Sequence, residues 1–246
     1  MAINPGTEQT PPRPPKPAGF VSPRTVALYG ILAALTTAIT CASYTPFSPT
    51  KGYFNLGESM VFFSALVFGW RAGAICGGIG SAAADILLGW GMFAPLTLVA
   101  KGAEGLIAGT IGRMKGGWAM SATIALLAGL LVAMGLSYLT GAEAYGMDEL
   151  LFLIMVFLAV SATLLLVMYL LGEKVHKATP IVLGIAIGGT VMVITYFLGE
   201  WLVLDVGLGK ALLEVPINVL QVTLGGTIGA LLSYYVKKSY PRITRM

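Results

Sequence analysis

The stretch from residue 181 to residue 204 reads IVLGIAIGGTVMVITYFLGEWLVL and carries one ionisable side chain, Glu200. A run of about 20 apolar residues is long enough to cross a bilayer as a helix, which bonds all its backbone polar groups internally. This stretch therefore predicts a transmembrane helix, and the rest of the chain must be interpreted with a membrane in place.

Other apolar runs flank this stretch on both sides. We expect about eight spans, near 25–45, 54–70, 72–90, 95–113, 118–139, 150–171, 181–204 and 208–236. Only Gly69-Trp70-Arg71 joins the second to the third, which favours a tight hairpin. Hydrophobic residues make up 57% of the chain and charged residues 11%, against about 25% charged in a soluble domain. The fold class predicted is therefore an all-α integral membrane protein, a polytopic helical bundle.

The remaining composition excludes several other classes. Residues 1–23 are rich in proline and polar groups and lack the apolar core of a signal peptide, so we expect a disordered cytoplasmic tail. Residues 24–246 then form a single transmembrane domain. Cys41 and Cys76 both lie in apolar runs, and no metal-ligand spacing or phosphate-binding glycine motif is found. We expect no metal, no cofactor and no nucleic-acid partner.

The distribution of basic residues predicts the orientation, because cytoplasmic loops are enriched in Lys and Arg. With the N-terminus in the cytoplasm, two of the 15 basic residues, Lys51 and Lys210, lie in outer loops, and Lys101 lies within a span. The others fall in cytoplasmic segments: Arg13, Lys16, Arg24, Arg71, Arg113, Lys115, Lys174, Lys177, Lys237, Lys238, Arg242 and Arg245. We therefore expect a multi-pass membrane protein with both termini in the cytoplasm.

Ionisable and amide side chains within spans are costly and mark candidate functional sites. On the expected orientation, all of those found here lie in the outer half of the membrane. The candidate substrate-binding residues are Tyr53, Asn55, Glu58, Asp85, Lys101, Glu104, Glu200, Glu214, Asn218 and Gln221. Several share a helix face by their spacing, such as Glu214, Asn218 and Gln221. Polar stripes at one depth, with aromatic residues beside them, predict the lining of an outward-facing pocket.

Simpler explanations exist for some of these residues. Lys101 could serve only to neutralise Glu104 or Asp85, and Glu58 and Glu200 could be interface residues whose side chains reach water. The four tryptophans fall at expected span ends, where an aromatic belt explains them. The only histidine, His176, is expected to be solvated in a cytoplasmic loop.

Several segments, taken in order, resemble a known family. They are 52–58 (GYFNLGE), Phe68-Gly69 with Ala72-Gly73, Ala84-Asp85, 95–109 (PLTLVAKGAEGLIAG) and 214–221 (EVPINVLQ). Together they resemble the substrate-binding S components of energy-coupling factor (ECF) transporters, closest to the riboflavin-type group. The resemblance extends over about 25–113 and 181–236.

The resemblance implies a subunit that captures a vitamin or vitamin precursor from outside for ATP-driven uptake by partner subunits. Those partners are a transmembrane coupling subunit and two cytoplasmic ATPases, so the chain itself is not expected to be an enzyme. The family uses small residues of its first helix to contact the coupling subunit, and here Gly30, Ala34, Ala38 and Ala42 recur every four residues. Close helix approach across a smooth face is the physical reason, and internal packing of the helix is the alternative.

One departure from the family is expected. Its members usually have six spans, so we predict a six-helix core at 24–115 and 178–238 with an inserted helical hairpin at 116–177. The main alternative for the whole chain is a self-sufficient proton-coupled transporter of a small metabolite, with Glu58, Asp85 or Glu104 as proton carrier. A lipid-modifying enzyme lacks a catalytic set in this sequence, and a structural scaffold would leave the polar stripes unexplained.

Overall fold

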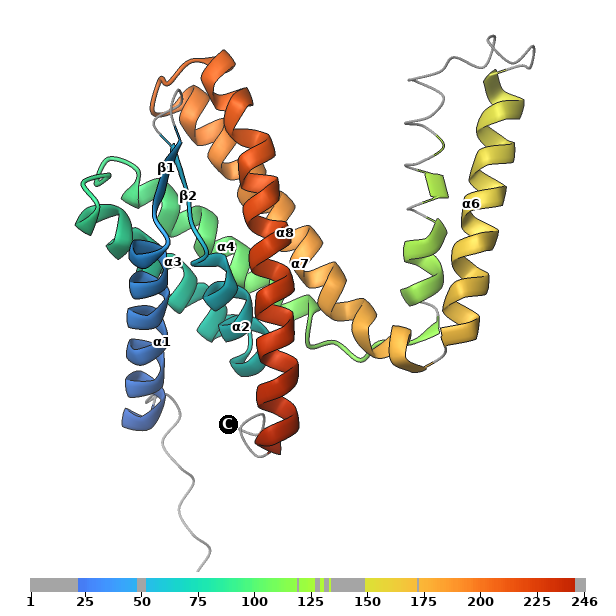
Figure 1. The fold of residues 1–246 in the computed structure, drawn as a ribbon, viewed down its shortest axis with the longest axis horizontal. Helices are drawn as coiled ribbons and strands as arrows, with labels where there is room; N and C mark the ends of the chain where they lie inside the picture. The colour runs from blue at the N-terminus through green and yellow to red at the C-terminus, as the bar shows by residue number, and fades with distance from the viewer. Residues whose placement is uncertain are drawn as a thin grey trace, which may run out of the picture.

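The computed structural model describes residues 22–47, 52–118, 120–126, 129–130, 133, 149–171 and 173–241. Its helices are α1 (Pro23–Ala42), α2 (Glu58–Phe68), α3 (Trp70–Leu87), α4 (Ala94–Ile111), α6 (Glu149–Leu171), α7 (Glu173–Leu202) and α8 (Leu208–Ser239). Two short strands, β1 (Thr45–Phe47) and β2 (Gly52–Phe54), form an antiparallel hairpin that faces away from the end of the bundle where α1 begins (Figure 1). The secondary structure of the described residues is therefore helical apart from this hairpin, which the apolar runs did not predict.

The helices coincide with the expected apolar runs, but their lengths differ. By length and composition, α1, the part of α7 from His176 to Leu202 and α8 could each cross a membrane. The expected span 54–70 is helical only over the 11 residues of α2, because residues 52–54 pair with β1 instead. Eleven residues make a helix of about 16 Å, roughly half the hydrocarbon thickness. The described residues therefore show a helical membrane protein without showing eight full-length crossings.

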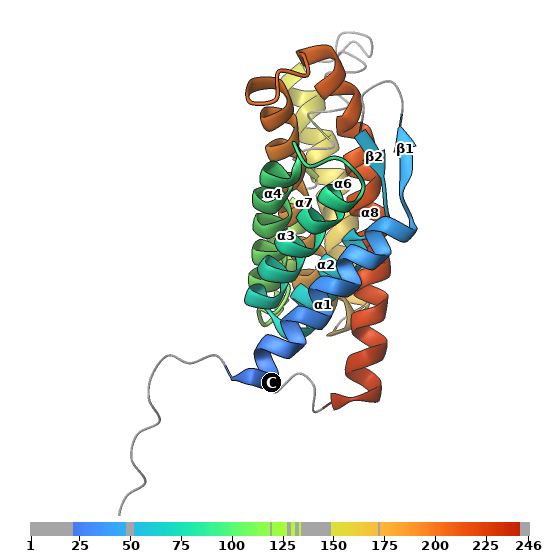
Figure 2. The same ribbon diagram turned by 90° about the vertical axis from the view of Figure 1, so that its left-hand side faces the viewer.

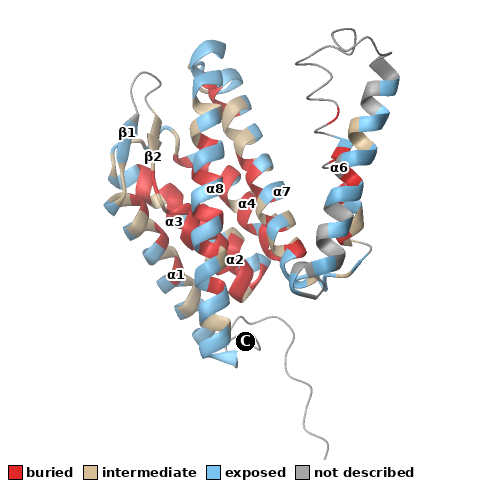
Figure 3. Cartoon of the chain, turned by 45° about the vertical axis from the view of Figure 1, so that its right-hand side comes forward, coloured by how far each residue is buried: buried red, intermediate tan, exposed pale blue. Residues whose placement is uncertain are grey.

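Six of the helices pack into one bundle (Figures 1 and 2). In it, α3 contacts α1, α2 and α4, while α8 packs against α2 and α7, and α7 also packs against α4. One group of buried residues joins α2, α4, α7 and α8: Phe62, Ala65, Ala100, Ala108, Met192 and Val222. Buried residues concentrate inside this bundle and exposed residues on its outer faces, as Figure 3 shows. The bundle therefore has an ordinary packed interior.

Glycines permit the closest helix contact, between α3 and α4. A Cβ atom on Gly73 would overlap the backbone of Gly105, and a Cβ on Gly105 would overlap the backbone of Gly73. The two backbones meet at this point, as small residues allow in membrane bundles. A single residue, Gly69 with φ of 95°, joins α2 to α3, so the turn is tighter than the expected Gly69-Trp70-Arg71. This left-handed conformation favours glycine.

Helix α6 and the described residues between 118 and 133 stand beside the bundle rather than within it (Figure 1). Large apolar side chains of α6 are exposed, including Met155, Leu158 and Leu170 at 53%, 57% and 71%. Surfaces of this kind are stable against lipid and unfavourable in water. The assignment of 116–177 as an inserted hairpin remains a prediction. The acidic residues Glu143 and Asp148 of its outer loop and residues 1–21 of the expected tail lie outside the described residues.

The structure corrects the expectation for His176. This residue lies on α7 and is half-buried, and its Nδ1 is 2.8 Å from the Ser121 hydroxyl. The same hydroxyl is 3.0 Å from that of Thr179, and Trp118 packs edge-on against the imidazole. The contacts attach the start of the 118–133 segment to the start of α7, so the histidine is a packing residue rather than a solvated loop residue.

Candidate functional site

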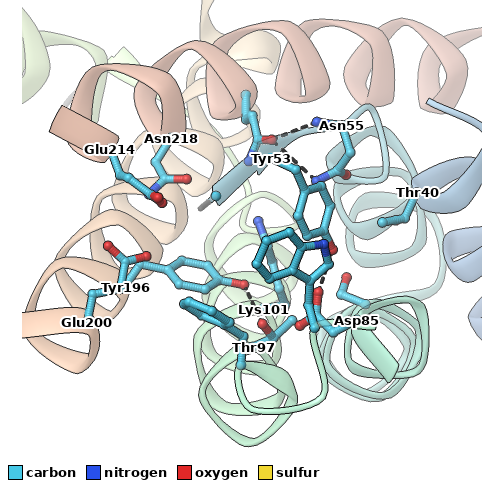
Figure 4. A pocket seen from close by; sticks show the side chains of 15 residues that line it. Thr40, Tyr53, Asn55, Asp85, Thr97, Lys101, Tyr196, Glu200, Glu214 and Asn218 are labelled. Atoms are coloured by element: carbon cyan, nitrogen blue, oxygen red, sulfur yellow. Dashed lines mark hydrogen bonds between the residues drawn. The ribbon is translucent and has the colours of Figure 1, made fainter. Parts of the chain in front are cut away.

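A pocket lies between α3, α4, α7 and α8, beneath the hairpin at the end opposite the start of α1. Its lining residues are Thr40, Gly52, Tyr53, Asn55, Ser81, Asp85, Trp90, Phe93, Thr97, Lys101, Tyr196, Glu200, Glu214, Asn218 and Gln221 (Figure 4). The space among them is about 530 Å³ when the part open to the outside is included. Sites for small molecules typically combine aromatic walls with a few polar groups, as this lining does.

The hairpin and α3 form one wall. The Tyr53 hydroxyl donates a hydrogen bond to Oδ1 of Asp85, and the Tyr53 ring stacks on Trp90 with centroids 6.4 Å apart. Burial raises the pKa of the Tyr53 phenol and the Asp85 carboxylate raises that pKa further, so the phenol remains a donor. Phe93 packs edge-on against Trp90 and extends this aromatic wall.

The loop after the hairpin is held by α8. Oε1 of Gln221 accepts hydrogen bonds from the backbone N–H of Asn55 at 2.7 Å and from its Nδ2 at 3.3 Å. Oδ1 of Asn55 in turn accepts from the backbone N–H of Gly57 at 2.8 Å. The Gln221 oxygen is therefore bonded to the loop, although the amide still lines the pocket. Asn218, one turn away on α8, makes no side-chain hydrogen bond to the described residues and remains free to bind a ligand.

A buried ion pair forms the base of the pocket. Lys101 on α4 pairs with Glu58 at the start of α2, and Oε2 of Glu104 lies 3.7 Å from the Lys101 nitrogen. Glu58 and Glu104 are 1% and 0% exposed and sit behind Lys101 without lining the pocket. Lys101 therefore neutralises Glu58 as well as Glu104. The idea that Glu58 reaches water is wrong, and the same holds for Glu200 at 3% exposed.

The wall opposite the hairpin comes from α7 and α8. Glu200 and Tyr196 approach from α7, and Glu214 and Asn218 approach from α8 (Figure 4). The Tyr196 hydroxyl donates to Thr97 on α4 at 2.8 Å, which fixes the ring against the pocket. A Cβ atom on Gly52 would overlap the Glu214 carboxylate, so the hairpin closes directly onto this wall.

Some buried oxygen atoms at the pocket have no hydrogen-bond partner in the described part of the chain. They are Oδ2 of Asp85, Oε2 of Glu200 and Oγ1 of Thr40. Buried polar atoms are nearly always bonded, and leaving one unbonded costs about 1–3 kcal/mol. Three such atoms around one space indicate that the pocket is built for a polar occupant.

The structure thus brings eight of the ten predicted site residues into the lining of one pocket and leaves Glu58 and Glu104 behind it. Their role in binding stays a prediction. Sequence reasoning missed Thr40, although Thr36 and Thr40 share a buried face of α1 and could have signalled it. It also assigned Trp90 to an aromatic belt, whereas this side chain lines the pocket. Among the described residues, no cluster of His, Cys, Asp or Glu could hold a metal ion.

Apolar helices that surround a polar pocket are the arrangement of a membrane protein with a binding site for a small polar molecule. A sequence model of the family described as "ECF-type riboflavin transporter, S component" matches residues 20–162, more than half of the chain. The chain belongs to this family, which confirms the resemblance drawn from its motifs. The match also runs through part of the 118–171 pair.

The chain is also similar to a protein of Pyrococcus woesei described as "Uncharacterized protein in gap 3'region". The two are 34% identical over 90 residues, which cover 37% of this chain and 60% of the relative. The aligned part thus spans less than two thirds of the relative's length, and the relative's description adds no activity.

Proposed function

We propose that this chain is the substrate-capture subunit of an ECF-type transporter and that it binds a small water-soluble vitamin or vitamin precursor. The observation that carries the proposal is the pocket itself, which is lined by eight of the polar or ionisable candidates. Membership of the S-component family supports the same conclusion. In this proposal, the hairpin closes over the ligand and Gln221 holds the closed loop.

In the same proposal the pocket opens to the outside of the cell and both termini lie in the cytoplasm. The chain then crosses the membrane about eight times, with the short α2 and the loop before it sharing one crossing. Partner subunits, one transmembrane and two ATPases, supply the energy.

The surface for the transmembrane partner is the small-residue face of α1. Gly30, Ala34, Ala38 and Ala42 are all exposed, and nothing lies within 4 Å of a Cβ placed on Gly30. The buried face of the same helix is formed by Leu32, Thr36 and Thr40 instead. The four small residues therefore do not pack against the described part of this chain, and a close-fitting helix of another subunit suits them.

Native mass spectrometry of the purified full-length protein tests the capture role. We expect release of a bound, water-soluble molecule of vitamin size. Uptake into proteoliposomes then separates the two transport hypotheses. ATP-dependent uptake that requires the partner subunits supports the proposal, whereas uptake by this chain alone, driven by a proton gradient, supports the proton-coupled alternative.

A further inference from the structure

The charges around the pocket are strongly unbalanced. Five carboxyl groups surround it or lie directly behind its wall, and one ammonium group accompanies them. The carboxyl groups are Glu58 from α2, Asp85 from α3, Glu104 from α4, Glu200 from α7 and Glu214 from α8, and the ammonium is Lys101. A buried charge is unfavourable unless it is paired. Glu200 and Glu214 interact directly and can share one proton, but the remaining carboxylates still outnumber the single ammonium group among the described residues at the pocket.

The ammonium group of Lys101 already has two carboxylate partners. Glu58 and Glu104 hold its ammonium group from behind, and the Tyr196 ring lies 5.5 Å from the same nitrogen on the pocket side. An anionic ligand would have to compete with two buried carboxylates for this single cation. It would also have to approach Asp85, Glu200 and Glu214, which all line the pocket.

Two carboxylate oxygens of the pocket lining accept no hydrogen bond from an N–H or hydroxyl donor in the described part of the chain, although the Glu200 carboxyl lies beside that of Glu214. They are Oδ2 of Asp85 and Oε2 of Glu200, on side chains that are 2% and 3% exposed. The two residues approach from different sides of the pocket, from α3 and α7 (Figure 4). Carboxylates at such depth accept strong hydrogen bonds from charged donors. A ligand with positively charged N–H groups would satisfy both.

The neutral part of the lining favours an organic cation over a metal ion. Tyr53, Trp90, Phe93 and Tyr196 present rings to the pocket, and cations bind over the faces of such rings. No metal-binding cluster is present in the described part of the chain. Aromatic walls also pack well against a flat heterocycle.

We propose that the pocket selects a small organic cation, a flat nitrogen heterocycle that bears an ammonium or similarly charged N–H group. This inference rests on the proposed capture function and narrows its substrate class. Flavins, which are neutral, and vitamins with carboxylate groups are then poor ligands of this member of the family.

A matched pair of probes tests the charge preference. They are 4-amino-2-methylpyrimidines that carry, at position 5, either an aminomethyl group, protonated at neutral pH, or a hydroxymethyl group, which is neutral. Binding to the full-length protein is measured by titration calorimetry and by the shift in melting temperature, with riboflavin as a neutral and biotin as an anionic probe. We expect the aminomethyl compound to bind at least about tenfold more tightly than its hydroxymethyl counterpart, as a charge-assisted bond replaces a neutral one.

Substitutions that each remove one carboxylate charge from the pocket provide the second test. Glu200→Gln and Asp85→Asn should each weaken binding of the cationic probe by about tenfold or more while changing binding of the hydroxymethyl probe much less. Asp205→Asn is the matched control: Asp205 is exposed in the connection between α7 and α8, and asparagine accepts its φ of 50°. The control should bind both probes as the unchanged protein does.

The outcomes separate this inference from the proposed function. Tighter binding of riboflavin or of the hydroxymethyl probe than of the aminomethyl probe overturns the charge preference and leaves the capture function standing. Equal loss of both probes in Glu200→Gln and Asp85→Asn, with normal melting temperatures, also overturns it. If no probe of any charge binds and no small molecule co-purifies, both the inference and the capture function fail.

Discussion

Two amides one turn apart on α8 have different surroundings. The Gln221 oxygen accepts two hydrogen bonds from Asn55, whereas the Asn218 side chain has no partner among the described residues and lines the pocket. We therefore expect the Gln221 side chain to hold the loop closed through its hydrogen bonds and the Asn218 side chain to bind the ligand. Their spacing in the sequence places both on the pocket face but cannot distinguish the two roles.

Asn218→Ala should weaken ligand binding by about 1–3 kcal/mol, because a polar group of the ligand then loses its partner in a buried site. This is roughly tenfold to a hundredfold in affinity. Titration calorimetry measures the effect with the molecule that co-purifies with the protein. The melting temperature without ligand should stay near that of the unchanged protein, and wild-type affinity in a well-folded variant would place the ligand elsewhere.

Gln221→Ala should instead lower the free energy of unfolding of the ligand-free protein by about 1–3 kcal/mol, since it leaves the buried N–H of Asn55 without its acceptor. Thermal unfolding in detergent measures this change. Asn218→Ala is the matched control, because it removes an amide one turn away on the same helix face that makes no hydrogen bond to the described residues. A stability loss in Asn218→Ala as large as in Gln221→Ala would show that the bonds to Asn55 are not the cause.

At the scale of elements, the contact between α3 and α4 depends on glycine. Gly105→Ala should lower the free energy of unfolding by about 1–3 kcal/mol, because its Cβ would overlap the Gly73 backbone and force the helices apart. Gly102 lies one turn earlier on α4, where the nearest atom to an added Cβ is 3.6 Å away, an ordinary contact. Gly102→Ala should be neutral or stabilising by up to about 1 kcal/mol. Equal effects of the two changes on thermal unfolding would contradict this account.

The exposed face of α1 carries a prediction about coupling. Ala38→Trp should prevent assembly with the transmembrane partner and abolish uptake, because a large ring blocks close helix approach. Ligand affinity should stay unchanged, since Ala38 is exposed on α1 and does not line the pocket. Leu35→Trp, on an adjacent exposed position that is already large, is the control and should assemble normally. Co-purification of the complex and calorimetry measure the two properties separately, and loss of ligand binding in Ala38→Trp with normal assembly would show the assignment to be wrong.

The positions of the helices could be predicted from the sequence because apolar runs bounded by Gly, Pro and charge determine them. The β1–β2 hairpin could not, since three-residue strands such as Gly52–Phe54 are too short to show an alternating pattern. The expected depth in the membrane grouped the eight polar residues that line one pocket in the structure, because side chains at one level of a bundle face a shared interior; their role in binding stays a prediction. The position of Glu58 and Glu104 behind Lys101 could not be predicted from depth, because it depends on how α2 packs against α4.

At the scale of the whole molecule, α1 begins at the same end of the bundle where α8 ends, and the pocket and hairpin lie at the other end (Figures 1 and 2). The first end also carries basic residues: the Arg113 side chain reaches the α2–α3 turn at Gly69, and Lys237 and Lys238 lie in the last turn of α8. Basic residues favour the cytoplasmic side of a membrane. The arrangement therefore predicts that both ends of the described chain face the cytoplasm and that the pocket opens outward.

Cysteine accessibility tests this orientation. In a background without Cys41 and Cys76, Ser239→Cys at the end of α8 should react with a membrane-impermeant maleimide only after the cells are permeabilised. Asp205→Cys, in the exposed connection between α7 and α8 at the pocket end, should react in intact cells. The two positions flank one helix of 32 residues, about 48 Å long, which is more than the roughly 30 Å of hydrocarbon it must cross. Labelling of Ser239→Cys from outside would reverse the orientation and turn the pocket toward the cytoplasm, a placement in which it could not capture a nutrient from the medium.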